Sequence, residues 1–307
     1  MLTEAQLEQR LNYITGSDAA VITNLSPYKT RVSLWQEKTR RSVQEDISHL
    51  NHIKFGTYFE DGVAQWFEAE SGKKLKPKES KMIIHPTIPF MAGNVDFEIE
   101  GENAILECKT AASDRDWGDG ENIIPPYYLM QIAHYCAVGG YDRAYLAVVF
   151  SAKREMRYYI YERNTALEEK LIKAETDFWF NNVQADICPD PVNEKDIISL
   201  YPSANADPII GDYGIIDKVS EIAKLAEQIK ELEKSKDSLK TEVVLYMKDH
   251  DSLLAPDGTL VVTWKYTKSS RRLDTEELRK KHKGLYNEFL KETSAQRRFL
   301  IKGAINE

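Results

Sequence analysis

The chain has little cysteine, no long apolar run and no excess of positive charge. With only three cysteines in 307 residues, a disulfide framework, an iron–sulfur cluster and a structural zinc site are not expected. No run of about 18 apolar residues is present, and the first ten residues are too polar for a signal peptide. The sequence therefore predicts a cytoplasmic protein with no membrane partner.

The formal charge of −8 argues against a protein that coats nucleic acid by charge alone. The charge is divided unevenly along the chain. Residues 1–200 hold 22 Lys and Arg against 31 Asp and Glu, whereas residues 264–307 hold 12 against 6. We therefore expect the C-terminal segment to contact a nucleic-acid backbone, with an ordinary solvated surface as the alternative.

The stretch from Pro89 to Thr110 is predicted to form a β-hairpin. Two apolar arms, residues 90–99 and 104–110, flank a break that contains Gly101. The arms also carry charge, which a buried strand normally lacks. A two-residue turn would set the paired positions of the two arms, and a shift of one residue would move every side chain to the other face.

In that register Asp96 lies opposite Glu107. Side chains alternate along a strand, so Lys109 shares their face while Val95 and Leu106 lie on the other. Two carboxylates about 5 Å apart repel each other unless a positive charge lies between them, and a divalent cation is the usual solution. The spacing thus predicts a metal site, with a surface hairpin and a cross-strand salt bridge as the alternative.

Two short patterns precede the hairpin. A first helix is predicted from Thr3, with Leu11 and Ile14 on its apolar face. Gly16 and Ser17 then form a turn into a second helix. Its backbone N–H groups and hydroxyl could bind an anion, and simple helix capping is the alternative.

Two longer helices flank the hairpin in sequence. Residues 54–72 form an amphipathic helix with Glu60 near the edge of its apolar stripe, so Glu60 is either a surface carboxylate or a third acid at the metal. Residues 127–138 form the other. On it Gln131 and Tyr135 are four residues apart and project from one face.

Strands and helices alternate through the first two thirds of the chain. Residues 144–150 and 155–161 are predicted as paired strands, and residues 167–181 as a long helix. The expected fold class is α/β, with a mixed β-sheet flanked by helices.

A proline-rich linker at residues 189–208 predicts a domain boundary. We expect one domain over residues 1–200 and a C-terminal accessory region over residues 201–307. The accessory region should contain a heptad helix over 215–248, a short β element and a basic helical tail. The helix could pair with another chain or fold back on its own body.

Taken together, these patterns resemble the YqaJ-like viral recombinases, phage-type alkaline exonucleases related to lambda exonuclease. The resemblance covers residues 10–161 and implies a restriction-endonuclease-like PD-(D/E)XK core. Where relatives commonly have Pro-Asp-Gly, this chain has Val95-Asp96-Phe97, which puts the local turn in doubt more than the metal. The matching residues are Ile14 to Ala20, Gly56-x3-Glu60, Asp96, Glu107-x-Lys109 and Gln131-x3-Tyr135.

The resemblance implies a Mg²⁺-dependent 5′-to-3′ exonuclease that acts on linear double-stranded DNA and leaves 3′ single-stranded tails for recombination. In the family pattern Asp96, Glu107 and the backbone carbonyl of Cys108 bind Mg²⁺, for which Mn²⁺ can substitute. Glu60 would complete the acidic shell.

The resemblance also implies roles beyond the metal. Lys109 would position or deprotonate the attacking water, and Gln131 would orient the nucleophile or a metal ligand. Tyr135 would be a packing or backbone-contact residue. Arg10 and Ser17 match positions that grip the 5′-phosphate of the DNA end.

Partners implied by the resemblance are double-stranded DNA ends, further copies of the chain in a ring such as a trimer, and a single-strand annealing protein, in a phage or prophage context. A RecB-like repair nuclease is one alternative, but its cluster cysteines and fused helicase are absent. The others are a catalytically inactive DNA-end binding module and an adaptor built on the heptad helix.

Overall fold

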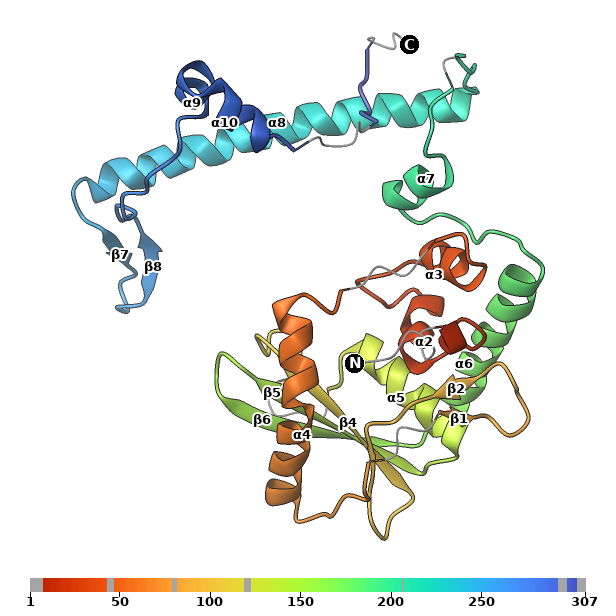
Figure 1. Cartoon of the computed structure of the whole chain (residues 1–307). Helices are drawn as coiled ribbons and strands as arrows, with labels where there is room; N and C mark the ends of the chain where they lie inside the picture. The colour runs from red at the N-terminus through yellow and green to blue at the C-terminus, as the bar shows by residue number, and fades with distance from the viewer. Residues whose placement is uncertain are drawn as a thin grey trace. The chain divides into compact units, whose positions relative to one another are not determined.

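The computed structural model divides the chain into two compact units, Met1–Pro202 and Ser203–Glu307. Figure 1 shows their secondary-structure elements. No helix in the described part of the chain is long and apolar enough to cross a membrane. The structure describes residues 8–42, 47–78, 82–118, 123–205, 207–291 and 297–302.

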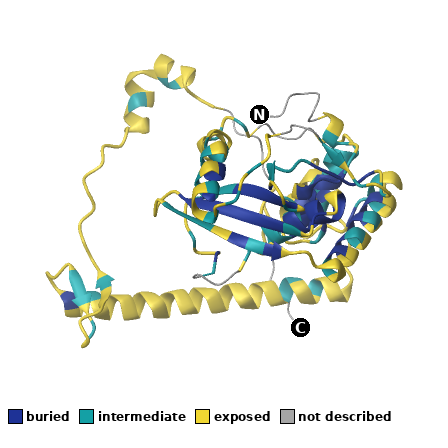
Figure 2. Ribbon diagram, turned by 90° about the horizontal axis from the view of Figure 1, so that it is seen from below, coloured by how far each residue is buried: buried dark blue, intermediate teal, exposed yellow. Residues whose placement is uncertain are grey.

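The first unit is built around a four-stranded sheet of β3 (Phe97–Glu98), β4 (Ala104–Ala111), β5 (Arg143–Phe150) and β6 (Glu155–Glu162), in that order. β4 and β5 are parallel, and each outer strand is antiparallel to its neighbour. The two middle strands are buried along most of their length (Figure 2), which explains their continuous apolar runs.

Helices cover both faces of this sheet. α5 (Pro126–Gly139) supplies the crossover that the parallel pair β4 and β5 requires, and it ends at Gly140 with a φ of 68°. α4 (Asn51–Ser71) covers the opposite face (Figure 1). Successive side chains of β4 alternate between the two helical layers. Ile105 packs in the cluster with α5, and Leu106 packs in the cluster with α4. The predicted mixed sheet flanked by helices is confirmed.

Further helices extend the α5 layer. α6 (Thr165–Phe178) is tied to α5 by two buried side chains, since His134 Nδ1 lies 2.9 Å from Glu175 Oε1. His134 Nε2 lies 3.0 Å from the Ala92 carbonyl, so the imidazole bridges three segments. The further segments of this unit are α2 (Gly16–Ile22), α3 (Arg31–Lys38), α6 (Thr165–Phe178), the π-helix η1 (Trp179–Gln184) and α7 (Glu194–Leu200).

The first arm of the predicted hairpin is not one strand. It divides into β2 (Ala92–Gly93), which pairs with β1 (Ile83–Ile84), and β3, which pairs with β4. The predicted register is correct, because Phe97 pairs with Leu106. The prediction for Val95 is wrong, since it packs with the α5 cluster. A bend at residue 96 interrupts the alternation of side chains before β3 begins.

The helix predicted from Thr3 begins outside the described residues. Residues 8–10 are helical, but the chain turns at Leu11, and Ile14 forms a β-bridge with Met91. The predicted continuation of this helix to Ile14 is therefore wrong. Ile14 is fully buried in the core, so its apolar character serves tertiary packing and not a helix face.

The second unit contains a long helix, a hairpin and two short helices. Among the residues of α8, all of which the structure describes, only Met247 is buried. Apolar heptad positions such as Ile229 and Leu232 are exposed. The elements are α8 (Tyr213–Met247), β7 (Ser252–Leu254), β8 (Leu260–Thr263), α9 (Thr275–Lys281) and α10 (Lys283–Glu288).

Candidate active site

Two charged side chains lie in the middle of the sheet. Glu107 and Lys109 are two residues apart on β4, so they project to the face that Ile105 shares with α5. Glu107 is 3% exposed, and its Oε1 accepts a hydrogen bond from Lys109 Nζ at 2.5 Å. A buried carboxylate costs folding free energy even when it is paired, so this position indicates a function other than stability.

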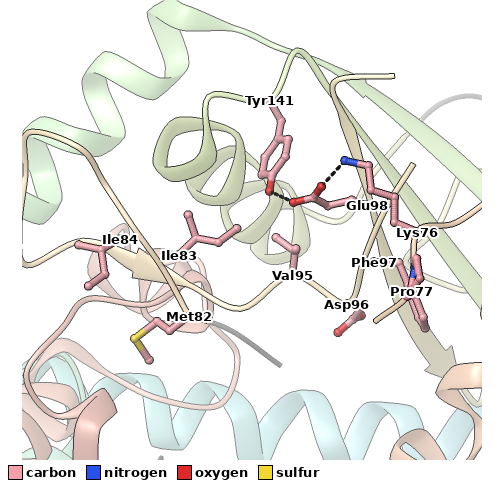
Figure 3. A pocket seen from close by; sticks show the side chains of 10 residues that line it. All are labelled: Lys76, Pro77, Met82, Ile83, Ile84, Val95, Asp96, Phe97, Glu98 and Tyr141. Carbon is pink, nitrogen blue, oxygen red and sulfur yellow. Dashed lines mark hydrogen bonds and ion pairs between the residues drawn. The ribbon is translucent and has the colours of Figure 1, made fainter. Parts of the chain in front are cut away.

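Asp96 approaches from the bend before β3. Its Oδ2 accepts a hydrogen bond from the Cys108 N–H at 2.8 Å, and the register of β3 against β4 places it opposite Glu107. Figure 3 shows Asp96 at one end of a pocket beside β3, apart from the hydrogen-bonded pair of Glu98 and Tyr141. The structure thus joins the acids that the sequence placed on one face.

Gln131 and Tyr135 complete this cluster from α5. Gln131 Nε2 donates to Glu107 Oε1 at 2.7 Å and to the Tyr135 hydroxyl at 3.1 Å. The Tyr135 ring is buried against two glycines. A Cβ on Gly16 would lie 2.4 Å from the ring, and one on Gly93 would lie 2.8 Å from it. Tyr135 is therefore a packing residue, as expected, and it also positions Gln131.

The cluster has more negative than positive charge. Burial and the Glu107 carboxylate raise the pKa of Asp96 well above its ordinary value, against the opposing effect of Lys109. Burial lowers the pKa of Lys109, but Glu107 and Asp96 outweigh burial and raise it. Glu107 Oε2 is buried and finds no hydrogen-bond partner among the described residues. An unsatisfied carboxylate oxygen in an acidic cluster fits a bound cation.

The donor set also fits a hard divalent ion. Asp96 and Glu107 supply carboxylate oxygens, and two carboxylates are typical of a protein site for Mg²⁺. A strand residue directs its N–H and C=O toward the same neighbour. Because the Cys108 N–H faces Asp96, the Cys108 carbonyl is directed to the same edge of β4.

Glu60 is not part of this cluster in the structure. Its carboxylate is ion-paired with Lys78, whose ammonium lies 5.1 Å from the centre of the Phe97 ring. Glu60 is still close enough that, after burial and Glu107, it contributes to the raised pKa of Asp96. Within the described residues, no three His, Cys, Asp or Glu side chains converge on a metal position. The third acid is therefore near the site but bound to a lysine.

Arg10 and Ser17 meet in a second polar cluster. Arg10 Nη2 donates to Ser17 Oγ at 2.9 Å and to Thr15 Oγ1 at 3.1 Å. Asp18 accepts from Lys38 Nζ at 2.8 Å. Burial raises the pKa of Asp18, but Lys38 and Arg10 outweigh it and lower the pKa to about 2. The structure therefore brings together the two residues expected at a 5′-phosphate.

The patterns in the sequence did not place two neighbours of the site, Tyr128 and Lys78. The Tyr128 ring centre lies 5.3 Å from Lys109 Nζ, a cation–π distance. The helical spacing offered a signal, since Tyr128 is three residues before Gln131. Lys78 follows α4 in a loop, and no local spacing pairs it with Glu60.

Comparison with known proteins adds a family. Residues 6–142 match the model of the YqaJ-like viral recombinase domain. The chain is 33% identical over 311 residues to the protein YqaJ of Bacillus subtilis (strain 168), a match that spans 98% of this chain and 95% of the relative.

Comparison with solved structures adds a fold. LHK-Exo, an alkaline exonuclease from Laribacter hongkongensis, matches with a TM-score of 0.50 and 18% identity. Its complex with dAMP matches with the same TM-score and 21% identity. Each match covers 60% of this chain and 94% of LHK-Exo. The expected resemblance to the YqaJ-like family is confirmed, and the fold is shared with an alkaline exonuclease.

Proposed function

Because the chain belongs to the YqaJ-like viral recombinase family, we propose that it is a Mg²⁺-dependent exonuclease that degrades linear double-stranded DNA from its 5′ ends. The observation that carries the proposal is the buried Glu107 carboxylate, which has an unsatisfied oxygen and faces Asp96 and Lys109. The remaining 3′ single-stranded tails would enter phage-type recombination. Mn²⁺ is expected to substitute for Mg²⁺.

The acidic residues would hold the metal. Asp96, Glu107 and the Cys108 carbonyl are the proposed ligands, and Glu60 would join them by exchanging its ion pair with Lys78. A bound Mg²⁺ lowers the pKa of a coordinated water and offsets charge on the scissile phosphate. The exchange would cost little free energy because the Glu60–Lys78 pair is partly exposed, and such pairs contribute little to stability.

Lys109 and Gln131 would act on the reacting groups. Lys109 is held beside Glu107 by a charged hydrogen bond, so its ammonium can stabilise negative charge that develops on the phosphate. Gln131 already donates one hydrogen bond to Glu107 and would keep that carboxylate aimed at the metal. Tyr135 would hold Gln131 in this orientation.

The proposed polarity rests on the cluster of Arg10 and Ser17. A terminal 5′-phosphate carries more charge than an internal phosphodiester, and a guanidinium with a hydroxyl can distinguish the two. The close packing of Gly16 on Tyr135 links this cluster to Gln131. A grip on the terminal phosphate would therefore place the next phosphodiester near the metal ligands.

The C-terminal unit is proposed to be an accessory to catalysis. We assign catalysis to residues 1–200 and propose that residues 201–307 contact DNA backbone, a sister subunit or a single-strand annealing protein. The positive charge from residue 264 onward and the exposed heptad positions of α8 support this assignment. A ring-like homo-oligomer around the DNA would be compatible with the proposed digestion from 5′ ends.

Digestion of end-labelled linear duplexes tests the proposal. Duplexes with 5′-phosphate or 5′-hydroxyl ends are incubated with and without Mg²⁺, and a closed circle serves as the substrate control. We expect Mg²⁺-dependent release of nucleotides from phosphorylated 5′ ends and no attack on the circle. Release from 3′ ends, or digestion in the presence of a chelator, would contradict the proposal.

A further inference from the structure

Three tyrosines form a row that ends at the candidate active site. The ring centres of Tyr28 and Tyr127 are 6.2 Å apart in an edge-to-face contact, and those of Tyr127 and Tyr128 are 4.2 Å apart. Tyr128 lies against Lys109, whose ammonium is bonded to Glu107. A row of aromatic rings therefore leads from the exposed Tyr28 to Lys109, which is hydrogen-bonded to the proposed metal ligand Glu107.

The outer ring of this row is exposed, and the backbone that carries it is held by hydrogen bonds. Tyr28 is 79% exposed, yet the Ser26 hydroxyl accepts hydrogen bonds from the N–H groups of Tyr28 and Lys29 at 3.2 and 3.3 Å. Pro27 restricts the backbone between them. The turn thus holds the backbone of a residue whose large ring faces solvent, where the ring adds little to the core.

The inner end of the row is backed by buried structure. The buried Trp117 ring packs on Tyr128 with ring centres 5.4 Å apart. Gln131 follows Tyr128 by three residues of α5, about 4.5 Å along the helix axis. One face of α5 therefore carries the end of the row and the side chain that bonds Glu107.

We propose that Tyr28, Tyr127 and Tyr128 form a stacking platform for an unpaired base next to the scissile phosphate. This inference rests on the proposed function, because it assigns a base-binding subsite to that active site. An exonuclease must accept every base, and stacking on an aromatic ring is tolerant of sequence because each base has a π-face. The hydroxyl of an exposed tyrosine such as Tyr28 can stay in water while its ring carries the base.

Removing the outer ring gives the first measurement on the full chain. Stacking on one ring changes binding by about five- to hundredfold per base, so Tyr28→Ala should slow digestion of phosphorylated duplex by that factor. Tyr28→Phe and Tyr28→Trp should keep at least half of the rate, because the platform uses the ring face. Tyr58→Ala is the matched control. Tyr58 is also 79% exposed, and it lies half a turn from Glu60 on α4.

Removing the base gives the second measurement. Duplexes are prepared with an abasic residue at the first or the second nucleotide of the 5′ strand. On one of these two duplexes, the wild-type digestion rate should fall to the rate of Tyr28→Ala on intact duplex. The rate of Tyr28→Ala itself should not fall further on that duplex. If Tyr28→Ala is as fast as wild type on intact ends, or loses the same factor on all three substrates, the platform is wrong.

A binding experiment separates this inference from the proposed function. Glu107→Gln is mixed with duplex that carries 2-aminopurine at the first or second position, and stacking is read as fluorescence quenching. If the fluorescence is quenched at one position and Tyr28→Ala abolishes that quenching, the platform is supported. This conclusion holds even if the wild-type protein digests no DNA, because a lack of digestion would overturn only the proposed nuclease activity. Equal quenching with and without the Tyr28 ring overturns the platform.

Discussion

Two aspartates of the first unit, one buried and one half-buried, differ in the sign of their pKa shifts. Burial raises the pKa of Asp18, but Lys38 and Arg10 reverse the effect and lower it to about 2. Burial and Glu107 raise the pKa of Asp96. Each carboxylate accepts one backbone N–H at nearly the same distance, 2.9 and 2.8 Å. The difference therefore lies in the charges around them and not in backbone hydrogen bonds.

The comparison separates a structural carboxylate from a candidate functional one. Asp18 has two cations for one carboxylate, so its charge stabilises the fold. Asp96 and Glu107 share the ammonium of Lys109, so this cluster is short of positive charge. Such a deficit lowers stability unless a cation binds, which is the reason to assign the metal here and not at Asp18.

Substitution at the metal ligands should have the largest effect. Asp96→Asn and Glu107→Gln should each reduce Mg²⁺-dependent digestion by roughly 10³ or more, because they remove metal ligands. DNA binding should persist, since the changes also relieve repulsion of phosphate. Rates and Kd for end-labelled duplex measure both effects. Retention of more than a tenth of the wild-type rate by either variant would refute the ligand assignment.

Removal of the Lys109 ammonium, which Asp96 and Glu107 share, should have the next largest effect. Lys109→Ala should slow turnover on the order of 10², as expected for a charge that stabilises the transition state. Lys109→Arg is the matched variant, because it keeps the charge and changes the geometry. Single-turnover rates at saturating Mg²⁺ isolate the chemical step. Unchanged turnover in Lys109→Ala would reassign the residue to a structural ion pair.

Arg10 tests the second cluster as a phosphate grip. Charged hydrogen bonds are each worth roughly 1.5 to 3 kcal/mol, so wild type should start on 5′-phosphate ends about one to two orders of magnitude faster than on 5′-hydroxyl ends. Arg10→Ala should erase this preference and make both ends equally slow. If wild type starts equally fast on both end types, the assignment of Arg10 and Ser17 to 5′-phosphate binding is wrong. This result would not contradict the proposed metal site.

Asp18→Asn should affect stability and not the chemical step. A fall of the pKa from 3.8 to about 2 corresponds to about 2 kcal/mol of unfolding free energy at pH 7. Because the folded pKa lies below the unfolded one, this contribution is complete above about pH 4 and is lost as the pH falls toward 2. Urea unfolding of both proteins at pH 7 and pH 3 measures the difference.

The matched control for that measurement is Asp96→Asn. It should lose no stability at pH 7 and should gain some, because it removes a carboxylate from an acidic cluster. If Asp96→Asn is destabilised as much as Asp18→Asn, the two carboxylates are both structural, and the comparison between them fails.

Several features of the site were predictable because they are local in sequence. The turn near Gly101 sets the register that places Asp96 opposite Glu107, and the period of a strand puts Lys109 on the same face. The four-residue spacing of Gln131 and Tyr135 predicts their shared helix face, and their side chains are hydrogen-bonded. Each of these relations depends only on the repeat of one element or on one tight turn.

Other features depend on contacts between distant segments. The division of the first hairpin arm near Asp96 arises because β2 pairs with β1 while β3 pairs with β4. The pairing of Glu60 with Lys78 depends on how the loop after α4 returns to the sheet. The contact between Tyr28 and Tyr127 joins segments 99 positions apart in the sequence. No local period carries this information.

By itself, the sequence determined the strand register, the helix faces and the set of acidic, basic and amide side chains that point toward one another. Those properties follow from backbone periods of two and 3.6 residues and from the chemistry of each side chain. Tertiary structure alone decided which distant cation two of the acids received: Asp18 is paired with Lys38, and Glu60 is paired with Lys78. The choice depends on which distant segment packs opposite, and a side chain's own period does not specify its partner.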